Sequence, residues 1–290
     1  MVGDEVVPGA AIGAPADDVR GILGALDTGG LDGLGQAAEA SGERIPRDDL
    51  ELLPPVPNPE KIICLGLNYH DHAEEVKRDP PPRPIWFAKF ANSLIGDGAE
   101  IVIPVADTED PEFEPRLEAE GVVIEGLGMD YEAELAVVIG REANRVARDE
   151  ALAFIAGAMP FNDVSARRLQ AESPLWTTGK APDTFAPCGP ALVTLDEIDA
   201  TTGGLQNLAL KTYLNGEEVQ SGCTDNMVFD VAEIVSWLSR TMTLVPGDII
   251  ATGTPAGVGW VKGLALDPGS TVRVEIEGLG SITNPVRAAA

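Results

Sequence analysis

Short segments that alternate polar and apolar residues, separated by turns rich in glycine and proline, cover most of this 290-residue chain. Such alternation is typical of strands with one buried face, and LALKTYLNGEEVQ and GSTVRVEIEGLG show it beside NG and PG turns. One segment has helical spacing instead, with a candidate cap at Asp230 followed by apolar Val231, Ile234, Val235 and Leu238. The sequence predicts an α+β fold that is predominantly β. It lacks the strand–helix rhythm and the glycine-rich strand-to-helix loop of a nucleotide-binding sheet.

A proline-rich segment divides the chain into two parts. LPPVPNPEK has four prolines between Pro54 and Pro59, which preclude a helix and favour an extended linker. We therefore expect a shortened N-terminal domain over residues 1–53, with weakly helical stretches at 17–26 and 31–41, and a larger domain over residues 54–290. Residues 105–129 are crowded with acids, so we expect an acidic insertion that is exposed to solvent.

The charge of the chain excludes several classes of partner. Asp and Glu total 47 against 20 Lys and Arg, and the resulting net charge of −27 repels nucleic acid phosphates and anionic lipid surfaces. No apolar run reaches the roughly 18 residues of a membrane helix, and the first residues do not resemble a secretory signal, so we expect a cytoplasmic protein. Its three cysteines, Cys64, Cys188 and Cys223, have neither metal nor disulfide spacing. The excess of acids suits a salt-loaded cytoplasm, and an acidic protein of an ordinary cytoplasm is the alternative.

Two glutamates alternate at the start of an apolar strand, YEAELAVVIG. Glu132 and Glu134 share one strand face with Ala136 and Val138, and the opposite face is apolar as well. Two buried neighbouring carboxylates repel each other and are poorly solvated, and a bound cation removes both problems. Ligands that are all oxygen favour Mg²⁺, Mn²⁺ or Ca²⁺ over zinc. The alternative is a strand that begins at a wet rim, with both acids in solvent.

The two histidines of the chain, His70 and His72, lie in LNYHDHAEEV. If a helical turn begins there, His72 and Glu75 share a face. A histidine held by a carboxylate is a usable general base near neutral pH. Two solvated histidines in a polar turn are the alternative.

Three further positions are candidates for chemistry, each with a plain structural alternative. Asp163, in PFNDVSAR, either supplies a third carboxylate or caps a helix. Lys180, one of only six lysines, lies in the Gly- and Pro-rich TTGKAPDTFAPCGP and is either functional or solvated. PGDIIATGTPAGVG lacks the ending of a P-loop, so its glycines either bring backbone N–H groups to an anion or form a tight turn.

Seven segments resemble, in order, those of the fumarylacetoacetate hydrolase superfamily: LNYHDHAEE, FAKFANSLIGDG, YEAELAVVIGR, PFNDVSAR, GKAPDTFAPCGP, LNGEEVQ and PGDIIATGTPAGVG. The resemblance runs from about Pro54 to Pro285, with one gap at the acidic insertion. It implies a mixed β-roll, commonly a homodimer, whose small N-terminal domain is shortened here. It also implies roles for nine residues: Glu132, Glu134 and Asp163 as ligands of Mg²⁺ or Mn²⁺, His72, Glu75 and Lys180 in catalysis, and Arg167, Gln170 and Thr254 in substrate contacts.

The activity that this resemblance implies is metal-dependent chemistry on a small 2-oxo-carboxylate. Its first form is hydrolysis of a C–C bond in an acylpyruvate-type 2,4-dioxo acid, with His72 activating a water and the metal stabilising the released enolate. The same enolate serves an isomerase of a hydroxymuconate-type diacid, an oxaloacetate decarboxylase or a sugar-acid dehydratase. A non-catalytic metabolite-binding protein is a rival from another class, but a pure binder has no need of His72, Glu75 and Lys180. An interaction protein built around the acidic insertion has no need of metal carboxylates.

Overall fold

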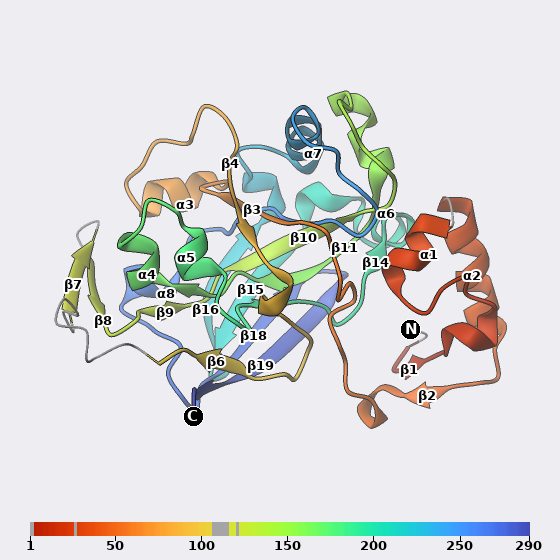
Figure 1. Cartoon of the computed structure of the whole chain (residues 1–290), viewed down its shortest axis with the longest axis horizontal. Helices are drawn as coiled ribbons and strands as arrows, with labels where there is room; N and C mark the ends of the chain where they lie inside the picture. The colour runs from red at the N-terminus through yellow and green to blue at the C-terminus, as the bar shows by residue number, and fades with distance from the viewer. Residues whose placement is uncertain (1–2, 26–27, 106–115, 120–121) are drawn as a thin grey trace.

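The computed structural model describes residues 3–25, 28–105, 116–119 and 122–290, and two sheets lie at its centre (Figure 1). The first has six strands in the spatial order β14 (Val193–Thr194), β11 (Ile155–Asn162), β10 (Ala133–Ile139), β17 (Ile249–Ala251), β3 (Ile62–Gly66) and β4 (Ile85–Lys89). The second has five strands in the order β16 (Glu217–Cys223), β15 (Ala209–Leu214), β18 (Thr271–Ile276), β19 (Gly280–Ala288) and β6 (Ile101–Ile103).

Both sheets mix parallel and antiparallel pairs. β10 runs antiparallel to β11 and β17, whereas β17 runs parallel to β3, and β19 runs parallel to β6. Four two-stranded pairs accompany the sheets: β1 (Glu5–Val6) with β2 (Ile45–Pro46), β5 (Leu94–Ile95) with β13 (Ala186–Pro187), β7 (Arg116–Ala119) with β8 (Val122–Glu125), and β9 (Met129–Asp130) with β12 (Ser165–Ala166). The predicted α+β fold with a mixed sheet is confirmed.

The largest core lies between the two sheets, because the inner faces of their strands are apolar. Leu135 and Val137 of β10 belong to the same buried cluster as Leu210 of β15 and Val274 of β18. Other members of β10, Ala136 among them, belong to a second cluster on the opposite face of the strand. β10 is therefore buried on both faces, as its sequence predicted.

Eight α-helices surround the sheets in the described part of the chain: α1 (Val19–Ala25), α2 (Thr28–Ala40), α3 (His70–Glu75), α4 (Arg167–Ala171), α5 (Thr177–Lys180), α6 (Leu195–Thr202), α7 (Val231–Ser239) and α8 (Gly259–Lys262). α7 is the helix predicted from its apolar spacing, and Asp230 caps it by accepting a hydrogen bond from the backbone N–H of Glu233 at 2.8 Å. None of the described helices is long and apolar enough to cross a membrane.

The N-terminal segment and the acidic insertion lie on opposite sides of the molecule in Figure 1. α1 falls within the first stretch predicted to be helical, and α2 overlaps the second but begins three residues before it, at Thr28. The division into domains at residue 53 remains a proposal. Much of the insertion lies outside the described residues, but β7 and β8 pair as a hairpin. The expectation of an exposed segment does not hold at its end. Leu127 and Met129 are buried there, because they pack into an apolar cluster with Tyr131.

Candidate active site

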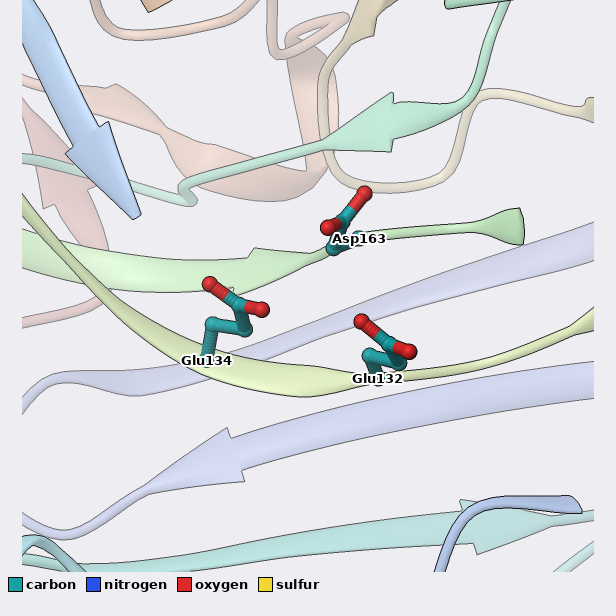
Figure 2. Close-up of side chains that lie close together, drawn as sticks. All are labelled: Glu132, Glu134 and Asp163. Atoms are coloured by element: carbon teal, nitrogen blue, oxygen red, sulfur yellow. The ribbon is translucent and has the colours of Figure 1, made fainter. Parts of the chain in front are cut away.

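Two acidic side chains leave the start of β10 on the face that also carries Ala136. Glu132 precedes the strand and Glu134 is its second residue, and because strand side chains alternate, both carboxylates point the same way (Figure 2). Glu132 is 6% exposed and Glu134 is fully buried, so the alternative of a wet strand rim is wrong.

Asp163 brings a third carboxylate to the same place. It follows β11, which pairs with β10 in a register that sets Ala133 opposite Asn162, and its backbone N–H donates to the carbonyl of Glu132 at 2.9 Å. One oxygen from each of the three carboxylates lies within 4.8 Å of the others. Figure 2 shows the two glutamates reaching toward Asp163 from the neighbouring strand. We call Glu132, Glu134 and Asp163 the carboxylate cluster; Asp163 does not cap α4, whose N-cap is Ala166.

The carboxylate cluster fits a hard divalent cation. Oε2 of Glu134 accepts a hydrogen bond from the backbone N–H of Gly253 at 2.8 Å, but its buried Oε1 has no hydrogen-bond partner among the described residues. Burial raises the pKa of Glu134, and the charges of Asp163 and Glu132 raise it further. A cation bound by all three oxygens removes the repulsion and satisfies the orphaned oxygen. This donor set suits Mg²⁺ or Mn²⁺.

Two buried lysines contact the carboxylate cluster. Nζ of Lys180, at the end of α5, lies 2.7 Å from Oε2 of Glu132 and 2.9 Å from Oδ2 of Asp163. Lys180 is 2% exposed, so it is not a solvated lysine. Nζ of Lys89 lies 2.7 Å from Oδ1 of Asp163, and burial lowers the pKa of Lys89 while Asp163 opposes that shift. Lys89 also donates to the carbonyls of Val164 at 3.0 Å and Phe185 at 2.8 Å, and to that of Lys180.

Lys89 was not singled out from the sequence, although FAKFANSLIGDG contains it. The available signal was a lysine two residues after Phe87 in a strand, which places both side chains on one face. Both are buried. The chain has only six lysines, so a lysine on the same strand face as a buried phenylalanine was a candidate site residue.

Arg167 opens α4 and is bound by two acids. Its Nη2 lies 2.6 Å from Oε1 of Glu132 and 2.7 Å from Oδ2 of Asp130, and its Nη1 donates to Oε1 of Gln170 at 3.1 Å. Asp130, which sequence reasoning also missed, is fully buried and accepts from the backbone N–H groups of Gly259 at 2.7 Å and Trp260 at 3.2 Å. Burial alone raises the pKa of Glu132, but Lys180 and then Arg167 lower it more, to about 2.

The predicted helical turn is α3, which contains both histidines. Nδ1 of His72 lies 3.3 Å from Oε2 of Glu75, and His72 is buried whereas His70 is exposed. Asn68, which lies before α3, accepts from the N–H of Phe229 at 2.9 Å and donates to its carbonyl at 3.1 Å. The geometry brings His72 and Glu75 together and leaves His70 apart.

The glycine-rich segment brings backbone N–H groups to anions, but these anions are the protein's own side chains. Gly253 N–H donates to Glu134, and Gly257 N–H donates to Oε1 of Glu75 at 2.9 Å. Between them, Oγ1 of Thr254 donates to the carbonyl of Ala133 at 2.9 Å. This segment therefore links the carboxylate cluster to α3.

A pocket of about 230 Å³ opens over these groups. It is lined by predicted site residues from all parts of the site: His72, Glu132, Arg167, Gln170, Lys180 and Thr254. Its apolar walls include Phe87, Trp176 and Trp260, and the ring of Phe87 meets that of Trp176 edge to face at 5.8 Å between centroids. Nζ of Lys180 lies 5.1 Å from the centre of the Phe87 ring.

Comparison with known proteins decides the family. Residues 61–287 match the family described as fumarylacetoacetate (FAA) hydrolase C-terminal. The chain belongs to this family. A human mitochondrial oxaloacetate tautomerase is 39% identical over 246 residues, which are 83% of this chain and 71% of the human protein.

Two solved structures extend the comparison. The 5-carboxymethyl-2-hydroxymuconate delta-isomerase of Mycobacterium smegmatis is 37% identical, with 86% of this chain and 87% of that chain covered and a TM-score of 0.68. The maleylpyruvate hydrolase of Sphingobium sp. SYK-6 is 30% identical, with 100% and 95% covered and a TM-score of 0.78. The chain is therefore an enzyme of the fumarylacetoacetate hydrolase family that acts on small carboxylates and has a buried acidic site suited to a divalent metal.

Proposed function

We propose that this enzyme transfers a proton at the carbon beside the 2-oxo group of a small 2-oxo-carboxylate, and so interconverts enol and keto forms or moves a double bond. The observation that carries the proposal is that His72, held by Glu75, lines the same pocket as Glu132 of the carboxylate cluster. A base and a metal site on one pocket are the two parts that enolisation needs. The proposal is supported by the higher identity of the chain to the tautomerase and the isomerase than to the hydrolase.

The roles of the residues follow from their positions. A divalent cation held by Glu132, Glu134 and Asp163 supplies a Lewis acid for the 2-oxo-carboxylate end of the substrate. His72 takes up and returns the proton, and Glu75, itself held by Gly257 N–H, orients the imidazole. Lys180 provides positive charge where negative charge develops on the substrate oxygen. Arg167, Gln170 and Thr254 line the pocket and contact the substrate.

The hydrolysis expected from the sequence is the second candidate. The similarity to the maleylpyruvate hydrolase supports this candidate, because the structural alignment with that enzyme covers 100% of this chain at a TM-score of 0.78. In this reaction His72 activates a water that attacks the second carbonyl of an acylpyruvate-type 2,4-dioxo acid. Oxaloacetate decarboxylation and sugar-acid dehydration use the same enolate, and no contact of the described pocket residues favours either.

One experiment separates these reactions. Purified enzyme with Mg²⁺ or Mn²⁺ is mixed in D₂O with oxaloacetate, a hydroxymuconate-type diacid or an acylpyruvate, and NMR follows deuterium entry at C3 and release of pyruvate. We expect metal-dependent deuterium entry or isomerisation without C–C cleavage. Pyruvate release from the acylpyruvate establishes hydrolysis instead. Binding without deuterium entry or product leaves a metabolite-binding protein and contradicts the proposal.

The homodimer and the cytoplasmic location expected from the sequence remain proposals. Sedimentation measures the oligomeric state directly. The human relative is named a mitochondrial protein, so cell fractionation in the native host is the check on location.

A further inference from the structure

The lining of the pocket reverses the charge balance of the chain. The sequence has 47 acidic residues and 20 basic ones, whereas the lining includes one acid, Glu132, and three bases, Arg78, Arg167 and Lys180. A concave lining of this composition attracts anions even into a strongly acidic protein. Two of the three bases are buried and one is exposed. We therefore ask how many anionic groups of a ligand the pocket can bind, and where.

The deep end of the pocket accommodates one carboxylate. There the carboxylate cluster and Asp130 contribute four negative charges, and Lys89, Lys180 and Arg167 contribute three positive ones. A divalent cation in the cluster therefore leaves this set of side chains with one net positive charge. The 2-oxo-carboxylate end of a substrate neutralises it. A second carboxylate at this depth is unfavourable, because a buried charge needs its own partner.

Arg78 lies at the open end of the same pocket. It is an exposed residue, whereas Arg167 and Lys180 are buried, and its backbone N–H donates to the carbonyl of Ala73 at 2.9 Å just past the end of α3. The remaining walls are mainly apolar, and Trp176 among them is half-buried. The lining thus presents a cationic deep end, apolar walls and a cationic mouth.

We propose that Arg78 is a specificity-determining residue that receives a second carboxylate at the far end of the substrate. The pocket then prefers a 2-oxo-dicarboxylate to a 2-oxo-monocarboxylate of the same length. This inference rests on the proposed function, because it assumes that the 2-oxo-carboxylate end occupies the metal site. A guanidinium suits the role, since its planar N–H groups bind a carboxylate through two parallel hydrogen bonds.

The test uses two pairs of ligands matched in length, 2-oxoglutarate with 2-oxopentanoate and 2-oxoadipate with 2-oxohexanoate. Calorimetry measures their dissociation constants on the Mg²⁺-loaded protein. We expect the diacid of at least one pair to bind about tenfold more tightly than its partner, the size of one charge-assisted hydrogen bond. Arg78→Gln is expected to remove that preference while leaving the affinity for the monoacids unchanged, and Arg78→Lys is expected to keep part of it.

Lys77→Gln is the matched control. Lys77 is exposed, is adjacent in the chain and does not line the pocket, so this variant removes the same charge and is expected to keep the preference. Equal affinities within both pairs for the wild type, or a preference that survives in Arg78→Gln, overturn the role of Arg78 alone. A preference lost equally in Lys77→Gln overturns it too, because it indicates a general field. Failure of all four ligands to bind overturns the proposed function, and this inference with it.

Discussion

The carboxylate cluster and helix α3 bring reactive groups to one pocket by different means. Glu132, Glu134 and Asp163 are set by the ladder between two long neighbouring strands, β10 and β11, which are buried throughout. His72 is carried by a six-residue helix that is held by Asn68 before it and by the contact between Glu75 and Gly257. The cluster is thus part of the core, whereas the histidine is attached to it through a few polar contacts.

This difference separates binding from chemistry. Strand pairing fixes the distances among the carboxylates, so metal affinity is expected to follow the integrity of the sheet. A short helix is easily perturbed, since isolated helices of this length are not stable. Changes in α3 are therefore expected to alter turnover while the metal site persists, and changes in the cluster are expected to affect both.

The largest effect is expected from His72→Ala. Loss of the general base lowers kcat by about 10²–10⁴-fold, while calorimetry finds an unchanged dissociation constant for Mg²⁺. His70→Ala is the control, because His70 is exposed on the same helix and is expected to keep most of the activity. Equal losses in the two variants would remove the support for His72 as the base.

Glu134→Ala tests the other region. Among the described residues its carboxylate has a buried oxygen without a partner, so the loss of Glu134 is expected to weaken Mg²⁺ binding by more than the roughly 10–100-fold that loss of an outer partner costs. Titration calorimetry on the purified variant gives the affinity. Glu142→Ala, at an exposed position, is the control. An unchanged affinity in Glu134→Ala would place the metal elsewhere.

Lys89→Met tests whether the carboxylate cluster, as part of the core, contributes to the stability of the fold. The substitution leaves Asp163 without one of its two cations and leaves three carbonyls without a donor, so we expect the free energy of unfolding to fall by about 3–5 kcal/mol. Urea unfolding measures it. Lys211→Met removes a partly exposed lysine that pairs with Glu218, and no measurable change is expected there. A Lys89→Met protein as stable as the wild type would show that the cluster does not depend on this ion pair.

The smallest effect concerns neither region but the acidic surface. Raising KCl from about 0.15 M to about 1 M shortens the screening length from roughly 8 Å to roughly 3 Å, which weakens repulsion among surface acids and leaves buried pairs almost unaffected. With a net charge of −27, the melting temperature in saturating Mg²⁺ is expected to rise with KCl. A flat curve to about 2 M, far past the screening range, would contradict adaptation to a salt-loaded cytoplasm.

Strand alternation predicted the arrangement of β10, because a period of two places Glu132 and Glu134 on one face without knowledge of any partner. Helical spacing likewise predicted α7 and the meeting of His72 with Glu75. These features depend on residues close together in the chain. Local pattern therefore sufficed for them.

Local sequence patterns could not predict contacts between residues that are far apart in the chain. The bond of Lys89 to Asp163 joins positions 74 residues apart and depends on how β4 and β11 lie in the folded sheet. Asp130 is buried because Arg167, Gly259 and Trp260 converge on it, and no short segment contains these partners. The resemblance to a family brought Asp163, Lys180 and Arg167 into one predicted site, but it did not indicate that Lys180 and Arg167 both pair with acids of that site.

Gly66 sets the width of the pocket by having no side chain. A Cβ at this position would lie 2.2 Å from Cζ3 of Trp176, so the indole rests directly against the backbone at the end of β3. Both residues line the pocket. The absence of a side chain at Gly66 therefore limits which ligands fit the pocket. A search of the sequence for reactive side chains does not find this position, although it determines the space available to a ligand.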